Sequence, residues 1–171
     1  MTLSLTKSEI AAIRARLQPK GQAFIDGRFA DAVSGETFAN ISPRDGAVIG
    51  QVAACDSADV DIAVRAARRA FESGVWRDQS PKARKKVLQR FADLFEANMD
   101  ELAILETLDM GKPISESRSI DVAVVLETLQ WYAECPDKLY DEIAPTGPGQ
   151  LGLITREPIG VVGAVVPWNF P

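Results

Sequence analysis

The side chains that most often carry out catalysis are scarce in this sequence. It contains no histidine, which excludes a Ser-His-Asp triad, a Cys-His pair and a histidine-ligated metal within these 171 residues. Its two cysteines, Cys55 and Cys135, are too few and too isolated for a zinc site or a disulfide framework. We therefore expect both to be small buried side chains and neither to be a nucleophile.

Composition narrows the class of protein. Hydrophobic residues make up 46% and charged residues 25% of the chain, which is typical of a globular protein rather than a disordered one. The formal net charge of -5 argues against a nucleic-acid-binding surface. No segment resembles a signal peptide, and no apolar run approaches the roughly 20 residues needed to span a bilayer. We expect a cytoplasmic protein.

Capping and turn signals predict the elements of the first third of the chain. Thr6 to Glu9 has the form of a capping box, so a short helix should run to about Leu17. Asp26-Gly27 stands between apolar residues and indicates a hairpin. A second extended pair is expected at 37–41 and 48–52. Together these segments predict a small antiparallel ribbon.

The middle of the chain is predicted to be helical. One helix, capped by Asp56 or Ser57, should carry an apolar stripe from 60 to 71, and a second should begin at Ser80-Pro81. A break at 98–100 starts a third helix, which ends at the Gly-Lys-Pro of 111–113. A last helix should run from near residue 115 until Pro136 stops it, with Trp131 and Tyr132 packed against other helices.

The tail changes character. A turn-rich connector at 144–149 precedes a weakly alternating segment at 151–155, which suggests an exposed strand. Residues 160–166 are almost wholly apolar and β-branched, which is typical of a strand buried on both faces of a parallel sheet. No second βαβ unit accompanies that strand. Gly160 and Gly163 do not form a dinucleotide fingerprint, and there is no Walker loop.

An ordered series of motifs across essentially the whole chain resembles the aldehyde dehydrogenase superfamily. Any one of them is weak, but their order is specific. The general similarity is greatest to enzymes acting on γ-glutamyl-γ-aminobutyraldehyde. The motifs are Phe24–Phe29 (the family's F-I-N-G-E-W hairpin), 42–46 (N-P-x-T-G), the helix at 59–71, 106–113 (E-T-x-D-x-G-K-P), Trp131-Tyr132-Ala133, and the final Pro167-Trp168-Asn169-Phe170-Pro171.

The resemblance implies an α/β fold with an incomplete sheet. Residues 1–140 would be the N-terminal helical and β-ribbon part of a Rossmann-like cofactor domain. Residues 141–158 would belong to the oligomerisation arm, which implies a homo-oligomer (a dimer or tetramer). Residues 159–171 would form the first Rossmann-like strand and the active-site turn.

The resemblance also implies a chemistry. The family oxidises an aldehyde to a carboxylic acid with NAD or NADP through a cysteine thiolate and a glutamate-activated water. Asn169 matches the asparagine whose side chain helps to hold the oxyanion. Trp168 and the carbonyls around Val166 and Pro167 match positions lining the cofactor groove, and Phe170 matches the wall of the substrate tunnel.

Two departures from the family pattern limit this prediction. The family's nucleophile, glutamate base and phosphate-binding glycine loop all follow the position that matches Pro171, so we expect the 171-residue chain alone to be inactive. The alternative is a non-catalytic truncated subunit that associates with a full-length homologue. The family sometimes places a monovalent cation near the aspartate that matches Asp109 and the carbonyls around Asn40 and Ile41, but we predict no metal ion here.

Overall fold

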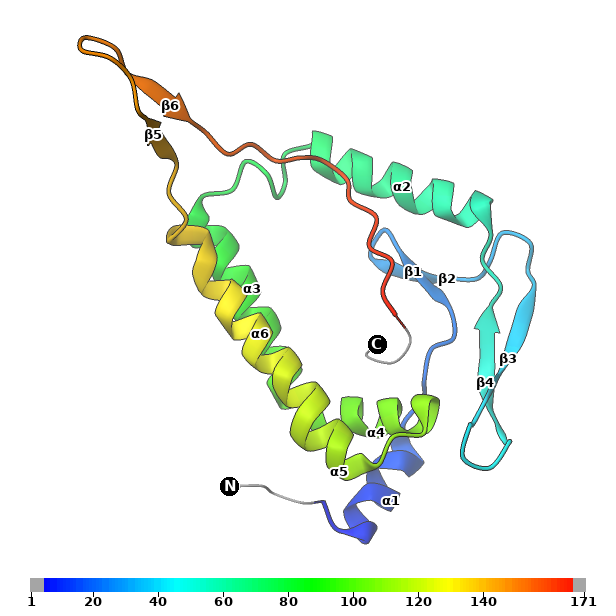
Figure 1. Ribbon diagram of the computed structural model, residues 1–171. Helices are drawn as coiled ribbons and strands as arrows, with labels where there is room; N and C mark the ends of the chain where they lie inside the picture. Colours follow the sequence, from blue (N-terminus) through cyan, green and yellow to red (C-terminus); the bar gives the residue numbers. More distant parts are fainter. Residues whose placement is uncertain (1–4, 168–171) are drawn as a thin grey trace.

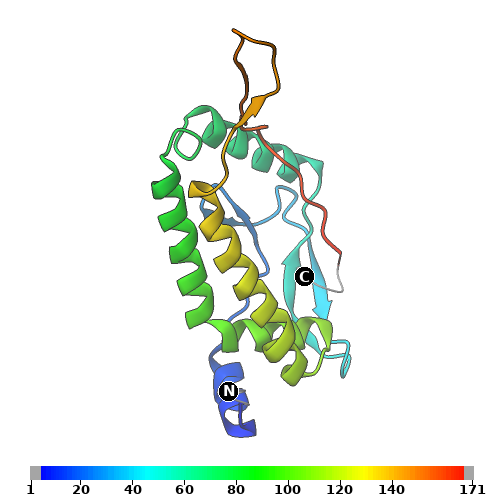
Figure 2. The same ribbon diagram turned by 60° about the vertical axis from the view of Figure 1, so that its left-hand side comes forward.

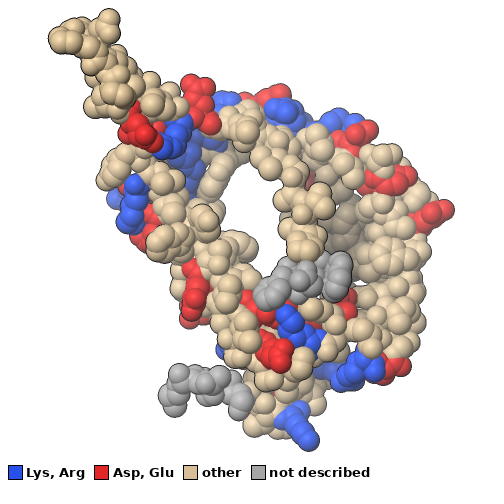
Figure 3. Space-filling model, viewed as in Figure 1, with Lys and Arg blue, Asp and Glu red and all other residues tan. Residues whose placement is uncertain are grey.

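Helices and short hairpins follow one another around an open ring in the computed structural model, which describes residues 5–167 (Figure 1). One long helix forms the upper side of the ring in this view, and a pair of antiparallel helices forms another side. Shorter helices close the lower side, and two hairpins close the remaining one. The space-filling view shows that side chains do not fill the centre, because an opening passes through the molecule (Figure 3).

The first helix and the two hairpins form where the sequence predicts them. Helix α1 spans Lys7–Arg16, and the predicted capping box is present between Thr6 and Glu9. Strands β1 (Ala23–Ile25) and β2 (Arg28–Ala30) pair antiparallel, as do β3 (Thr37–Ile41) and β4 (Val48–Ala53). Asp26 and Gly27 both have positive φ, at 55° and 77°, as a tight two-residue hairpin requires.

Three capped helices make up the middle of the chain. Helix α2 spans Ser57–Glu72, α3 spans Pro81–Ala97 and α4 spans Met99–Met110. The side chain of Asp56 caps α2 and that of Ser80 caps α3, as predicted. Helix α4 ends at Gly111, whose φ of 81° lies in the left-handed region that glycine adopts without strain.

The last predicted helix is present but irregular. It begins with α5 (Ile114–Glu116), widens into one π-helical turn, η1 (Ser117–Asp121), and continues as α6 (Val122–Glu134) before a short 3₁₀ turn, η2 (Cys135–Asp137). Pro136 lies in that final turn and ends the helix. Helices α3 and α6 lie side by side in both views (Figures 1 and 2).

The buried core is small and lies at the junction of α4 and α6. Met99, Ala103 and Val122 form its centre, and Phe95 and Leu126 pack against it. Away from this junction, many of the large apolar side chains are exposed. The prediction that Trp131 and Tyr132 pack between helices is wrong for this chain, because their exposed fractions are 71% and 62%.

The tail begins with a hairpin that projects away from the ring (Figure 1). Strands β5 (Glu142–Ala144) and β6 (Gly152–Ile154) pair antiparallel, which confirms the predicted strand near 151–155. The strand predicted at 160–166 is not formed: residues 155–167 carry no regular secondary structure. A strand needs a neighbour to satisfy its backbone, and the three sheets within residues 5–167 are two-stranded antiparallel ribbons that do not include this segment.

The predicted α/β chain, with a helical layer and small antiparallel ribbons, is confirmed. The parallel Rossmann-like sheet that the resemblance implies is not formed within residues 5–167, whose sheets are all antiparallel. None of the helices within residues 5–167 is both long and apolar enough to cross a membrane.

Candidate functional site

The predicted site residues lie at the end of the chain, and the structure describes two of them. Val166 and Pro167 end an extended segment that leaves β6, passes α2 and enters the ring (Figure 1). Both are exposed. Trp168, Asn169 and Phe170 lie outside the described residues, so their predicted roles stay predictions.

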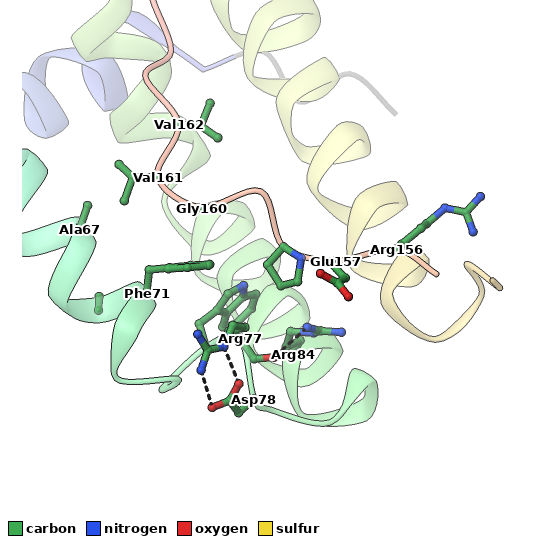
Figure 4. A pocket seen from close by; sticks show the side chains of 13 residues that line it. Ala67, Phe71, Arg77, Asp78, Arg84, Arg156, Glu157, Gly160, Val161 and Val162 are labelled. Atoms are coloured by element: carbon green, nitrogen blue, oxygen red, sulfur yellow. Dashed lines mark hydrogen bonds and ion pairs between the residues drawn. The ribbon is translucent and has the colours of Figure 1, made fainter. Parts of the chain in front are cut away.

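A pocket of about 970 Å³ lies where this segment crosses α2 (Figure 4). Ala67 and Phe71 of α2 form one wall, and Gly160 to Val162 form the opposite wall. Two of the lining side chains are aromatic and three are arginines. The remaining lining residues are Ala70, Trp76, Arg77, Asp78, Arg84, Arg156, Glu157 and Pro158.

The charged groups around this pocket are largely neutralised by close partners. The Arg77 guanidinium donates to Asp78 at 2.6 Å and lies 5.3 Å from the centre of the Phe71 ring. The hydrogen bond from Arg77 holds the pKa of Asp78 below its usual value. Arg156 donates to Glu142 at 2.5 Å and also to the carbonyl of Tyr140.

The lining residues include no thiol, hydroxyl or lysine that could act as a nucleophile. The Arg84 guanidinium donates to the carbonyl of Arg77 at 3.4 Å. The pocket therefore offers apolar and aromatic contact area beside three arginines and the carboxylates of Asp78 and Glu157.

The cysteines occupy different surroundings, and the expectation that both are buried is wrong for Cys55. Cys55 is exposed between β4 and α2, where partial desolvation and the carboxylates of Asp59 and Asp56 raise the pKa of its thiol. Cys135 is half-buried, and its thiol donates to the carbonyl of Trp131 at 3.6 Å. A raised pKa lowers the thiolate fraction, which supports the prediction that Cys55 is not a nucleophile.

The structure brings together two residues that the sequence analysis associated with a cation. The Asn40 amide donates to the Asp109 carboxylate at 2.5 Å, which joins β3 to α4 beside a pocket of about 290 Å³. Within residues 5–167, no three side chains of the histidine, cysteine, aspartate and glutamate types gather closely enough to hold a metal ion.

A buried charge network escaped the sequence analysis. The Lys112 ammonium lies 2.6 Å from Asp121 Oδ2 and 3.8 Å from Glu106 Oε1, and the three side chains are only 14%, 6% and 13% exposed. Burial and the neighbouring carboxyl of Asp121 raise the pKa of Glu106 to about 7. Burial alone would raise the pKa of Asp121, but hydrogen bonds from Lys112 and Glu106 outweigh it and lower that pKa.

The sequence signal for this network was weak. Gly111-Lys112-Pro113 is fully explained as a helix stop, and Asp121 lies at the end of η1, a π-helical turn that periodicity does not predict. A lysine inside such a helix stop, followed by an aspartate on the next helix, is the pattern that could have predicted the charge network.

Comparison with known proteins gives consistent matches. The chain is 52% identical over its whole length to the aminoacetaldehyde dehydrogenase of Pseudomonas aeruginosa, of which it covers 34%. A solved structure of P. syringae indole-3-acetaldehyde dehydrogenase, in complex with NAD+ and IAA, superposes with a TM-score of 0.93 at 52% identity over 98% of this chain and 34% of that one. The γ-glutamyl-γ-aminobutyraldehyde dehydrogenase of Burkholderia cenocepacia gives a TM-score of 0.93 at 51% identity, with the same shares covered.

The chain spans about a third of the length of the curated relatives it matches. The model of the aldehyde dehydrogenase family matches residues 29–171, which is most of the chain and includes the motif around Asn169. The sequence, the fold and the relatives agree, and the chain belongs to the aldehyde dehydrogenase family, of which it represents the N-terminal portion.

Proposed function

We propose that this chain forms the N-terminal third of an NAD(P)-dependent aldehyde dehydrogenase that oxidises an aldehyde to a carboxylic acid. The observation that carries the proposal is the 52% identity over all 171 residues to an aldehyde dehydrogenase. The P. syringae relative with a TM-score of 0.93 was solved with NAD+, which supports a nicotinamide cofactor for the complete protein. When bound, the cofactor supplies the hydride acceptor.

The contribution of this chain to the chemistry would be to bind and orient. In the proposal, the Asn169 side chain donates an N–H to the oxyanion that develops when the aldehyde carbon becomes tetrahedral. Trp168 and the carbonyls of Val166 and Pro167 line the cofactor groove, and Phe170 forms part of the substrate-tunnel wall. The nucleophile and the base would come from the other two thirds of the protein, so the 171-residue chain is proposed to be inactive alone.

The division into parts follows the same proposal. Residues 1–140 form the N-terminal helical and β-ribbon part of the cofactor domain, and 141–158 belong to the oligomerisation arm. Residues 159–171 provide the first strand of the cofactor domain and the active-site turn. The β5–β6 hairpin projects from the ring (Figure 2), and its exposed apolar side chains support a homo-oligomer. Ile143 and Leu153 on this hairpin are 72% and 64% exposed.

A chimera tests the proposal. Residues 1–171 are joined to the remaining two thirds of the P. aeruginosa aminoacetaldehyde dehydrogenase, and aldehyde-dependent reduction of NAD and of NADP is measured. We expect an active enzyme in which Asn169→Ala lowers kcat by about 10²–10³-fold. Asn98→Ala is the matched control, because the Asn98 amide only donates to the Leu94 carbonyl between α3 and α4.

Three results would each contradict part of the proposal. A folded chimera without activity, beside an active parent enzyme, would show that this chain does not supply a competent N-terminal third. An unchanged kcat in Asn169→Ala would remove the oxyanion role. Oxidation of an aldehyde by the 171-residue chain itself would refute the predicted inactivity.

A further inference from the structure

The hairpin of β5 and β6 carries no charged side chain along its length, and charged side chains gather at its base. No residue from Ile143 to Thr155 is an aspartate, glutamate, lysine or arginine, whereas Glu142 and Arg156 stand at the two ends of this run. In the space-filling view, acidic and basic side chains lie where the hairpin leaves the ring (Figure 3). The hairpin is therefore an uncharged projection on a charged base.

Backbone pairing alone holds this hairpin weakly. Strands β5 and β6 share three residue pairs, over 142–144 and 152–154. A single two-stranded hairpin is at best marginally stable in water. Near the tip, the Thr146 hydroxyl donates to the Gln150 carbonyl at 2.8 Å, but this bond lies within the hairpin. Contacts at the base must therefore set the direction in which the hairpin projects.

Arg156 joins the two legs of the hairpin at this base. Its backbone N–H donates to Asp141 Oδ1 at 3.0 Å, and its guanidinium donates to Glu142 Oε1 at 2.5 Å and to the Tyr140 carbonyl. One residue of the returning leg thus holds three consecutive residues of the outgoing leg, and we call these four residues the base clasp. A guanidinium presents its donors in a rigid fork, which the single ammonium group of a lysine does not reproduce.

The outgoing leg starts from a fixed point on the helices. The Lys85 ammonium of α3 lies 2.7 Å from Glu134 Oε2 and 3.2 Å from Asp137 Oδ2, and the Lys85 side chain is only 19% exposed. Gln89 donates to the other oxygen of Glu134 at 3.1 Å, and Lys138 also donates to Glu134. These contacts hold the end of α6 against α3. The base clasp begins two residues further along the chain, so it decides the angle at which the hairpin leaves.

We propose that Arg156 is a positioning residue for assembly, because the base clasp holds the hairpin at the angle that a second copy of the protein requires. The inference rests on the proposed function, in which this hairpin is part of the oligomerisation arm. Arg156, Asp141 and Glu142 are 53%, 56% and 61% exposed, so dissolved ions screen their attraction. Assembly should therefore weaken as the salt concentration rises, whereas contact between apolar side chains alone is not weakened by salt.

The first test measures assembly of the chimera described above by sedimentation velocity over a series of protein concentrations. The dissociation constant of the oligomer should rise about 5-fold between about 50 mM and about 500 mM NaCl. Arg156→Met should raise the dissociation constant at low salt by a similar factor and remove its dependence on salt, because methionine keeps an apolar stem without the donors. Arg156→Lys keeps the charge without the fork and should give an intermediate value.

Hydrogen–deuterium exchange in the 171-residue chain gives a second measurement, which does not require the rest of the protein. Arg156→Met should speed exchange of the amides at 142–144 and 152–154 about 5-fold and leave α3 and α6 unchanged. Arg28→Met is the matched control. Arg28 is an exposed arginine on a strand of another hairpin, and the described residues include no ion-pair partner for it, so this variant should change neither measurement.

The outcomes separate this inference from the proposed function. Assembly or hairpin exchange that is unchanged in Arg156→Met would overturn the inference, and so would a salt dependence that survives in this variant or a chimera that stays monomeric. Equal weakening by Arg28→Met would also overturn it, because the effect would then come from net charge. An active chimera with any of these results would leave the proposed function standing. An inactive chimera whose assembly responds to salt and to Arg156→Met as stated would support the base clasp and count against the proposed function.

Discussion

Replacing Lys112 with methionine should destabilise the chain strongly, by an amount that depends on pH. Lys112 is the cation between two carboxyl groups, and all three side chains are at most 14% exposed. Removing one partner of a buried ion pair costs about 3–5 kcal/mol, because the remaining charge is left without compensation. Methionine fills a similar volume, so the loss should come from charge rather than from a cavity.

The size of the loss follows from what the two carboxyls can do without the ammonium group. The pKa of Glu106 is about 7 with Lys112 present, so Glu106 already carries a proton in much of the population at neutral pH. Asp121 is 2.6 Å from Lys112 and loses its main stabilising contact, so its pKa in the folded variant should rise above the unfolded value. We therefore expect a loss of about 3 kcal/mol at pH 8.

The pH dependence has a definite sign. A carboxyl whose folded pKa is raised holds a proton that the unfolded chain releases, so its unfavourable effect grows as pH rises and fades as pH falls. The loss should thus shrink by about 1–2 kcal/mol between pH 8 and pH 5, at up to about 1.4 kcal/mol per pH unit for one proton. Urea unfolding followed by circular dichroism at both pH values measures it.

The control and the refuting result are specific. Lys86→Met on α3 removes an exposed lysine for which the structure shows no ion pair, and it should change the free energy of unfolding by no more than about 0.5 kcal/mol. A loss in Lys112→Met that is the same at pH 5 and pH 8, or no larger than in Lys86→Met, would refute the idea that a buried charge network holds this junction together.

Three further perturbations test other parts of the fold. Glu106→Gln should flatten the pH dependence of stability between about pH 5 and 7. The raised pKa of Glu106 contributes stability at pH values below the pKa of the unfolded chain, and this stability is lost as pH rises through about 7. Urea midpoints measured across that pH range test the prediction. Gly111→Ala should cost about 1–2 kcal/mol of unfolding free energy, since its φ is 81° and the new Cβ would lie 2.9 Å from a proline ring, whereas Gly50→Ala meets no atom within 4 Å and should be nearly neutral. The pKa of Glu134, held at about 2 chiefly by its hydrogen bond from Lys138, should move back toward its usual value in Lys138→Met, as followed by carboxylate NMR; an unchanged value would show that this hydrogen bond does not hold it.

Much of the local structure could be predicted because short-range signals decide it. The capping side chains of Thr6, Asp56 and Ser80 fix where α1, α2 and α3 begin, since each satisfies a backbone N–H within three residues. Asp26-Gly27 fixes the first hairpin for the same reason, because few residue pairs accept two positive φ angles.

What could not be predicted depends on contacts over longer range. Asp121 lies in a π-helical turn, which has no periodic signature in the sequence. The charge network joins Asp121 to Lys112 and Glu106, which are 9 and 15 residues away in the sequence. The apolar stripe of α2 correctly predicts a helix but not burial: Val60 and Val64 are 58% and 46% exposed. Periodicity identifies the face that must be covered, and only the presence of a partner covers it.

Most of the candidate site residues were predicted from the family resemblance. Asn169 was identified by motif alone, and its amide lies beyond the described residues, so that prediction stands on sequence and on relatives. The pocket beside the tail joins residues from α2, α3 and 156–162, a combination that no single motif contains.

The prolines on either side of the apolar run at 159–166 have a consequence for how this chain behaves during synthesis. An uncharged, β-branched run from Ile159 to Val166 that waits in solvent is a template for amyloid-like stacking with other chains. Pro158 and Pro167 bracket it, and neither residue can donate a backbone hydrogen bond to a growing ladder. They act as gatekeepers that restrict any mispaired strand to the eight residues between them, so the segment can wait for its correct neighbours with a reduced risk of aggregation.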